Sequence, residues 1–168
     1  MDGTLITRAK VVAFYGVKGE GDAVTYHRMQ GFTALNVTKN PKEYTRQYVD
    51  EEFEQTDVTG FSPSMAYTFD RYKGNEVHDD IVKITDGEKI GSEAIRDIVV
   101  VDLSAAEGSP NAYKRSFSVI PDTEGDSMDA YTYSGTFRTK GEKIEGTATV
   151  AADALTCTFE PAANTAAN

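Results

Sequence analysis

The stretch 44-YTRQYVDEEFEQTDVTGFSPSMAYTFDRY-72 contains two halves with different hydrophobic patterns. In the second half, Met65, Tyr67 and Phe69 alternate with small or polar residues. Strict alternation of this kind predicts a strand that buries one face. We therefore interpret the stretch as two strands joined by a turn at 59-TGFSP-63.

The first half, residues 44–58, does not alternate. Its aromatic and β-branched residues fall on both parities, and the acidic run Asp50-Glu51-Glu52 lies among them. A strand with this pattern would be apolar and charged on both faces. That is unusual for a strand at the surface of a monomer, because such a strand normally buries only one face.

The remaining segments predict a mainly β fold. Alternating or apolar runs predict strands at 10–17, 33–38, 113–120, 129–138, 143–150 and 155–159. The run 96-RDIVVVDL-103 predicts a strand that is buried on both faces. The order of these segments predicts two packed antiparallel sheets, a β-sandwich or barrel, with one short α-helix on its flank.

The helix is predicted within residues 75–95. Asn75 is a good N-cap, Val77, Ile81 and Ile84 recur at helical spacing, and Gly87 follows where a helix stops. His78 falls in the first turn, and we expect it to face solvent. A helix this short is marginal alone and must pack against a sheet.

The 168 residues suffice for one domain with an ordinary core. We expect a single domain over 1–160 and a disordered tail over 161–168. No window is apolar enough to span a membrane, and the N-terminus lacks a signal-peptide pattern. Cys157 is the single cysteine and alternates with Leu155 and Phe159, which predicts a small buried residue.

The charge balance disfavours a nucleic-acid binder. The chain has 17 basic and 27 acidic residues, a net charge of −10, and its basic residues are scattered. Binding to phosphates requires a basic footprint that displaces counterions. A like-charged surface keeps a protein soluble and also repels polyanions.

No motif predicts a catalytic, cofactor-binding or metal-binding site. His27 and His78 lack metal-ligand spacing to each other or to Cys157. The acidic loop 121-PDTEGDSMD-129 does not match the calcium loop of an EF-hand and is expected to be a solvated hairpin loop. We therefore expect that the protein is not an enzyme.

Four segments taken together resemble the major tail protein, or tail tube protein, of long-tailed bacteriophages, and most closely those of phages that infect Gram-positive bacteria. They are 44-YTRQYVDEEFEQTDVTGFSPSMAYTFD-70, 75-NEVHDDIVKITDGEKIGSEA-94, 96-RDIVVVDL-103 and 130-AYTYSGTFRTKGEKIEGTATV-150. The resemblance covers roughly residues 5–160 and depends on the order of the segments, since none is a catalytic fingerprint.

The resemblance implies a structural virion protein that acts by self-assembly. Six copies would form a ring whose sheets join into an inner β-barrel, and rings would stack into a hollow tube that conducts DNA without binding it specifically. The implied partners are a tape-measure protein, tail-assembly chaperones and a tail terminator. The implied location is the virion tail, assembled in the cytoplasm of the host bacterium.

Assembly would explain the unusual pattern of residues 44–58, which we call the ribbon. Rings that close and stack need apolar surface beyond that of one core, and Tyr44, Tyr48, Val49 and Phe53 provide it. We predict that these four residues contact neighbouring subunits; the alternative is that they complete a sandwich within the chain. A further prediction is that acids of the ribbon face the lumen. These acids are Asp50, Glu51, Glu52 and Glu54.

Two other interpretations stay open. The tail-tube fold also occurs in contractile tails, phage-derived bacteriocins and the type VI secretion tube, and one sequence separates these poorly. A soluble β-sandwich module for binding or adhesion is an alternative of another class, but such modules usually display aromatic platforms that include Trp, and this chain has none.

Overall fold

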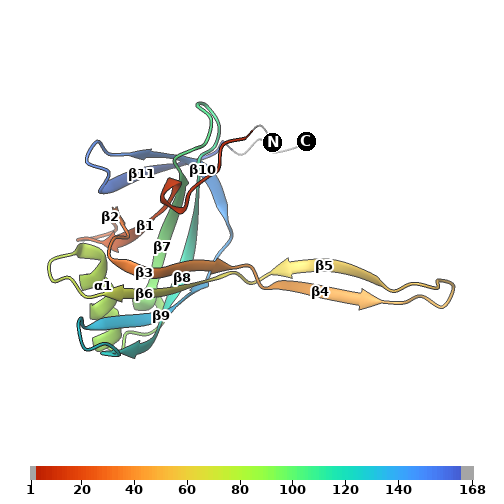
Figure 1. The fold of residues 1–168 in the computed structure, drawn as a ribbon, viewed down its shortest axis with the longest axis horizontal. Coiled ribbons are helices and arrows are strands. Elements are labelled where there is room, and N and C mark those ends of the chain that lie inside the picture. The colour runs from red at the N-terminus through yellow and green to blue at the C-terminus, as the bar shows by residue number, and fades with distance from the viewer. Residues whose placement is uncertain (1–2, 164–168) are drawn as a thin grey trace.

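The computed structural model describes residues 3–163, which form a compact body and a long projecting hairpin (Figure 1). The elements in chain order are η1 (Arg8–Lys10), β1 (Val11–Lys18), β2 (Val24–Arg28), β3 (Phe32–Thr38), β4 (Pro41–Arg46), β5 (Gln55–Phe61), β6 (Ser64–Asp70), α1 (Glu76–Asp86), η2 (Gly91–Ala94), β7 (Ile95–Asp102), β8 (Ala112–Glu124), β9 (Thr132–Thr139), β10 (Ile144–Val150) and β11 (Thr156–Pro161). The predicted mainly β fold with antiparallel pairing and a short flanking helix is confirmed for these residues.

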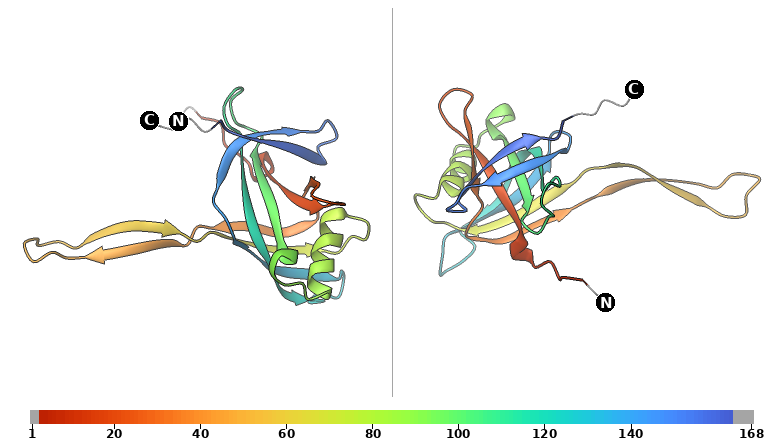
Figure 2. Two further views of the ribbon diagram at one scale, coloured as in Figure 1. Left: turned by 180° about the vertical axis from the view of Figure 1, so that it is seen from behind. Right: turned by 90° about the horizontal axis from the view of Figure 1, so that it is seen from above.

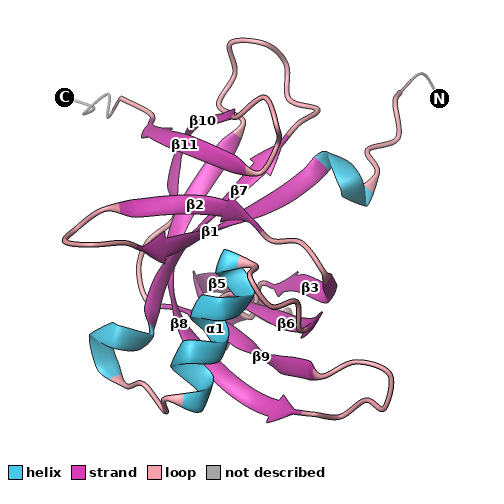
Figure 3. Ribbon diagram, turned by 90° about the vertical axis from the view of Figure 1, so that its left-hand side faces the viewer, coloured by secondary structure: helices cyan, strands magenta, loops and turns pink. Residues whose placement is uncertain are grey.

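The body is one continuous antiparallel sheet in the order β10-β11-β2-β1-β7-β8-β9-β6-β3. The sheet closes on itself because β10 pairs with β11 on one side and with β8 on the other. The 13-residue β8 makes this closure compatible with an extended sheet, since its first residues pair with β10 and its last with β9. The two layers predicted from the sequence are therefore parts of one folded sheet (Figure 3).

Two hydrophobic clusters lie on opposite faces of β1 and β7. In β1, Val12 and Phe14 belong to the cluster inside the closed part of the sheet, whereas Ala13 and Tyr15 belong to the other cluster. That second cluster also takes side chains from β6, β8, β9 and α1. Burial of β7 on both faces was predicted and is confirmed, with Ile98 in one cluster and Val99 in the other.

The helix begins and ends where the sequence predicts. The Asn75 side chain accepts hydrogen bonds from the backbone N–H groups of Val77 and His78, and Gly87 is the C-cap. Val77, Ile81 and Ile84 are all buried against the sheet. The short helix is thus stabilised by tertiary packing as well as by its cap.

The prediction that His78 faces solvent is wrong, because its side chain is completely buried. The ring stacks on Phe69 with a centroid separation of 4.3 Å. Nδ1 accepts the Tyr72 N–H at 3.1 Å, and Nε2 lies 2.8 Å from the carbonyl oxygen of Gln30. Both contacts are satisfied by the neutral tautomer that carries its proton on Nε2.

A buried polar network ties α1 to β1 and β7. The carboxylate of Asp80 forms an ion pair with Arg96, at 2.7 Å from Nε and 3.0 Å from Nη2. It also accepts the Tyr15 hydroxyl at 2.8 Å. No sequence pattern predicted this network, although Asp80 occupies the same helical face as Val77, Ile81 and Ile84.

Several strand boundaries also differ from prediction. β2 was not predicted at all, and β8 continues into the acidic segment that was expected to be a loop, as far as Glu124. Cys157 is buried as expected, but Leu155 is exposed because it precedes β11. The predicted disordered tail begins at Pro161, which still ends β11, and residues 164–168 lie outside the described residues.

We expect Asp80→Ala to destabilise the fold by about 3–5 kcal/mol, because it leaves the buried Arg96 charge without its partner. Urea unfolding measures this change. The control is Asp79→Ala, which removes a partly exposed ion pair with Arg71 and costs about 0–1 kcal/mol. Equal losses in the two variants would contradict the structural role of the network.

Lowering the pH should destabilise the protein through its buried His78. Burial lowers the pKa of His78 below its ordinary value, so the unfolded chain takes up the proton first as the pH falls. The contribution of neutral His78 to the free energy of unfolding is therefore fully present above about pH 6.5 and decreases below it. Urea unfolding at pH 7.5 and 5.5 should show a larger loss for the wild type than for His78→Gln. An equal loss of unfolding free energy in both proteins would contradict the buried, neutral state of His78.

Candidate functional site

The hairpin formed by β4 and β5, residues 41–61, lies outside the packed body, and we call it the arm. It is a separate two-stranded sheet whose register runs from Pro41 opposite Phe61 to Arg46 opposite Gln55. Figures 1 and 2 show that it projects far beyond the body on the side away from α1. The arm continues the β3–β6 pair, since β3 leads into β4 and β5 leads into β6.

The interpretation of residues 44–58 as one long strand is wrong. The chain reverses between Arg46 and Gln55, so the segment contains the end of β4, a tip and most of β5. Tyr48, Val49 and Phe53 lie in the tip, outside both strands, so the alternation of a strand does not apply to them. Tyr44 and Val58 have the same parity but lie on opposite faces, because the chain reverses between them. The acidic run Asp50-Glu51-Glu52 lies in the tip and not in a strand.

Both faces of the arm are uncovered. Tyr44 lies opposite Asp57 on one face, and Val58 lies opposite Glu43 on the other. Tyr44 and Val58 are each about half exposed, and residues 41–59 are exposed throughout. The alternative that the ribbon completes a sandwich within the chain is therefore contradicted by the structure.

The tip, residues 47–54, carries three of the four predicted contact residues. Tyr48 is 49% exposed, Phe53 is 79% exposed and Val49 is fully exposed. The amide of Gln47 donates to the backbone carbonyls of Glu51 and Glu52 at 3.2 and 3.3 Å. The Gln55 amide donates to the carboxylate of Glu51. These bonds give the tip a defined shape while its aromatic and aliphatic groups remain in water.

The junction between arm and body is also defined. Asn40 adopts a positive φ of 45°, which Asn tolerates better than most residues. Its side-chain amide donates to the carbonyl of Ser62 at 3.1 Å, and Ser62 N–H donates back to the Asn40 carbonyl at 3.1 Å. These bonds hold the two connecting segments together where the arm meets the body.

In the described sheet, the outer edge of β3 has no strand partner. This strand is the last in the sheet order, and its other edge pairs with β6. Unpaired backbone groups along such an edge are a template for another strand. The open edge and the arm are contiguous, because β3 and β4 follow each other along the chain.

Within residues 3–163 there is no cluster of three or more His, Cys, Asp or Glu side chains arranged to hold a metal ion. Burial raises the pKa of the Cys157 thiol to about 12, so it is not a reactive thiolate near neutral pH. No helix in the described part of the chain is both long and apolar enough to cross a membrane.

The sequence matches no family model, and no curated protein matches it either. Solved structures do match in fold. A chain from the tail of an empty gene transfer agent particle, obtained by helical refinement with C6 symmetry, gives a TM-score of 0.61 at 10% identity, over 83% of this chain and 97% of that one. A chain from the virion of the native particle gives 0.59 at 8% identity, over 83% and 97%. The protein shares the fold of these chains.

We expect the arm to be dispensable for folding, because its strands pair only with each other. Thr38 and Ser64 are paired in register, so an Asn-Gly turn can replace residues 39–63. The loss should be about 1–3 kcal/mol, since the Pro63 carbonyl accepts two hydrogen bonds from Thr139, from its hydroxyl at 2.9 Å and from its N–H at 3.4 Å. Thermal unfolding followed by circular dichroism measures it. Failure of this variant to fold would mean that the arm belongs to the core.

Proposed function

We propose that this protein is a structural tail tube subunit that self-assembles into stacked, hexameric rings. The rings form a hollow tube through which DNA is delivered. The observation that carries the proposal is the arm, whose apolar side chains Tyr44, Tyr48, Val49 and Phe53 are exposed in the described structure. The fold likeness to a chain of a C6-symmetric tail supports the same function.

The contact residues are proposed to be Tyr44, Tyr48, Val49 and Phe53. All four are exposed in the single chain. A two-stranded hairpin is at best marginally stable in water, so contact with neighbouring subunits would stabilise the arm as well as the assembly. The open edge of β3 would pair with a strand of the next subunit, which joins separate sheets into one inner barrel.

The DNA conduit is proposed to repel its cargo and not to bind it. The net charge of −10 supports this, because an acidic wall offers no cations to phosphates. Asp50, Glu51, Glu52 and Glu54 were predicted to face the lumen. Their position in the arm tip also permits contact with a neighbouring subunit.

The finer parts of the proposal follow from the resemblance of the sequence. They are a long-tailed phage of a Gram-positive host, a virion tail location after assembly in the host cytoplasm, and a tape-measure protein, chaperones and a terminator as partners. A contractile tail or related injection system is the second candidate within the same class.

A soluble β-sandwich binding module is the candidate of another class. It needs no projecting arm with apolar residues on both faces, so the arm favours assembly. A protein that stays monomeric at high concentration, with or without seeding by preformed tubes, would favour the binding module.

Electron microscopy and sedimentation of the purified protein test the proposal. Hollow tubes or six-fold rings are expected. Assembly should proceed at high protein concentration, since an interface that forms between copies depends on their concentration.

Phe53→Asp should give a folded monomer that does not polymerise, because it places a charge in an interface that must exclude water. Its thermal transition should match that of the wild type, because Phe53 touches no core. Phe53→Leu is the matched control and should still assemble. Loss of the thermal transition in Phe53→Asp, or normal tubes formed by it, would each contradict the proposed interface.

A further inference from the structure

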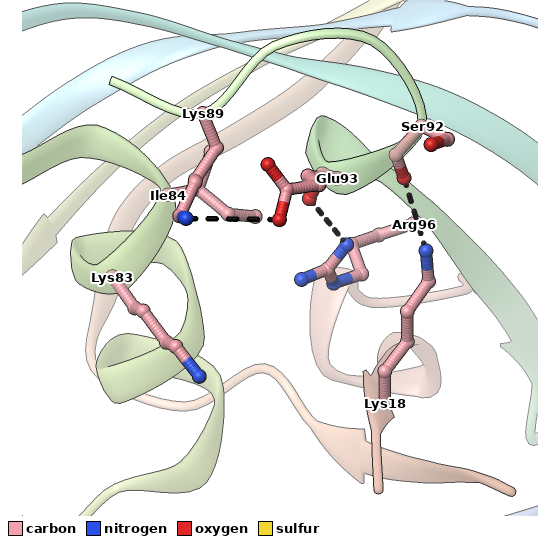
Figure 4. A pocket seen from close by; sticks show the side chains of 7 residues that line it. All are labelled: Lys18, Lys83, Ile84, Lys89, Ser92, Glu93 and Arg96. Atoms are coloured by element: carbon pink, nitrogen blue, oxygen red, sulfur yellow. Dashed lines mark hydrogen bonds and ion pairs between the residues drawn. The ribbon is translucent and has the colours of Figure 1, made fainter. Parts of the chain in front are cut away.

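A basic pocket lies at the end of the body that faces away from the arm. It has a volume of about 370 Å³ and lies between the C-terminal half of α1, η2 and the adjoining ends of β1 and β7 (Figure 4). Lys83 and Lys89 border one side, and Lys18 and Arg96 border the other. Four of the 17 basic residues thus surround one opening in a chain of net charge −10.

The three lysines are the groups available to a ligand. Arg96 is already committed, because its guanidinium holds Asp80 and donates to the carbonyls of Glu93 and Ile95. Lys18 donates only to the carbonyl of Ser92 at 3.1 Å, and Lys89 is 3.6 Å from Glu93, which is a loose ion pair. No hydrogen bond or ion pair joins the Lys83 ammonium group to another residue within 3–163.

The pocket also has apolar surface. Ile84 is only 2% exposed, so this surface comes mainly from the aliphatic stems of Lys83 and Lys89. Glu93 is the single acid among the residues that line it. The nearby acids Asp86 and Glu88 line a separate cavity together with Asp122 and Glu124. A complementary ligand would therefore present an apolar group flanked by negative charges.

The arm tip has this composition. Phe53 lies between Glu52 and Glu54, and all three side chains are exposed. No hydrogen bond or ion pair in the described structure engages the carboxylates of Glu52 and Glu54. The tip and the pocket lie at opposite ends of the long axis of the molecule, so they cannot meet within one chain (Figures 1 and 2).

We propose that the basic pocket at α1 and η2 receives the Glu52-Phe53-Glu54 tip of a second copy of this chain. Phe53 packs against the aliphatic stems of Lys83 and Lys89, and the two carboxylates pair with the ammonium groups of Lys83, Lys89 and Lys18. The contact is head-to-tail and uses different surfaces on the two copies, so it can repeat without limit. It deepens the proposed tube function and rests on it, since it gives the arm a specific docking site on a neighbouring subunit.

Carbodiimide cross-linking of the full-length protein tests the contact directly. Mixing unlabelled and ¹⁵N-labelled chains identifies intermolecular products by mass spectrometry. Amide cross-links between Glu52 or Glu54 of one copy and Lys83, Lys89 or Lys18 of the other are expected. Cross-links from the tip only to lysines elsewhere, or no intermolecular cross-links from the tip, would overturn the proposal.

Charge reversal gives an independent test. Lys83→Glu/Lys89→Glu should reduce the yield of cross-links from Glu52 and Glu54 to Lys18 by roughly tenfold or more. Glu52→Lys/Glu54→Lys should weaken self-association, measured by sedimentation, by a similar factor. Mixing the two variants should restore association, measured by sedimentation, because each supplies the charge that the other has reversed. The matched control Lys73→Glu/Lys140→Glu changes two exposed lysines that do not line the pocket. Failure of the mixed pair to associate better than either variant alone would overturn the charge pairing.

The outcomes separate this inference from the tube function. Tubes without tip–pocket cross-links would support the tube function and contradict the proposed docking site. Tip–pocket cross-links without tubes would support the docking site and contradict the proposed tube function. Binding of labelled double-stranded DNA that Lys83→Glu/Lys89→Glu abolishes, with no tip–pocket cross-links, would make the pocket a nucleic-acid site and overturn the proposal.

Discussion

A two-stranded hairpin has no interior, so apolar side chains on its faces leave water only where another part of the chain or another molecule covers them. The arm of this protein obeys that constraint at both faces and at its tip. Tyr44 and Val58 lie on opposite faces, and Phe53 lies at the tip, all exposed. An arm of this composition is a liability for a monomer, because exposed strands and apolar patches promote association. Its presence on a well-packed body is the main physical argument for the proposed assembly.

The body provides the rigidity that such an arm needs. The arm extends a strand pair, β3 and β6, that is hydrogen-bonded into the main sheet and covered by the cluster around Phe69. The opposite end is fixed by α1, which the buried Asp80–Arg96 pair and the His78 contacts hold against the sheet. The β3–β6 pair and α1 are therefore joined through the main sheet and the cluster around Phe69. This arrangement suits a subunit that contacts neighbours at both ends.

Much of the fold could be predicted because local signals and tertiary structure agree. Alternation at Met65, Tyr67 and Phe69 identified a core strand, and Asn75 and Gly87 identified both ends of α1. The errors at His78 and Asp80 share a physical cause, since the environment of these residues is set by distant segments. His78 is buried by Gln30 and Phe69, and Asp80 is neutralised by Arg96. Periodicity within a window of sequence carries no information about such partners.

By itself, the sequence determined the mainly β class, the place of the single helix within residues 3–163, the acidic character of the surface and the anomaly of residues 44–58. It did so because strand alternation, helix caps and net charge are local or additive properties. Only the tertiary structure decided that this anomaly is a hairpin, that both of its faces are uncovered, and that a basic pocket lies at the opposite end of the body. Those features depend on where the chain reverses and on which surfaces remain after the core has packed, and neither is encoded in any single segment.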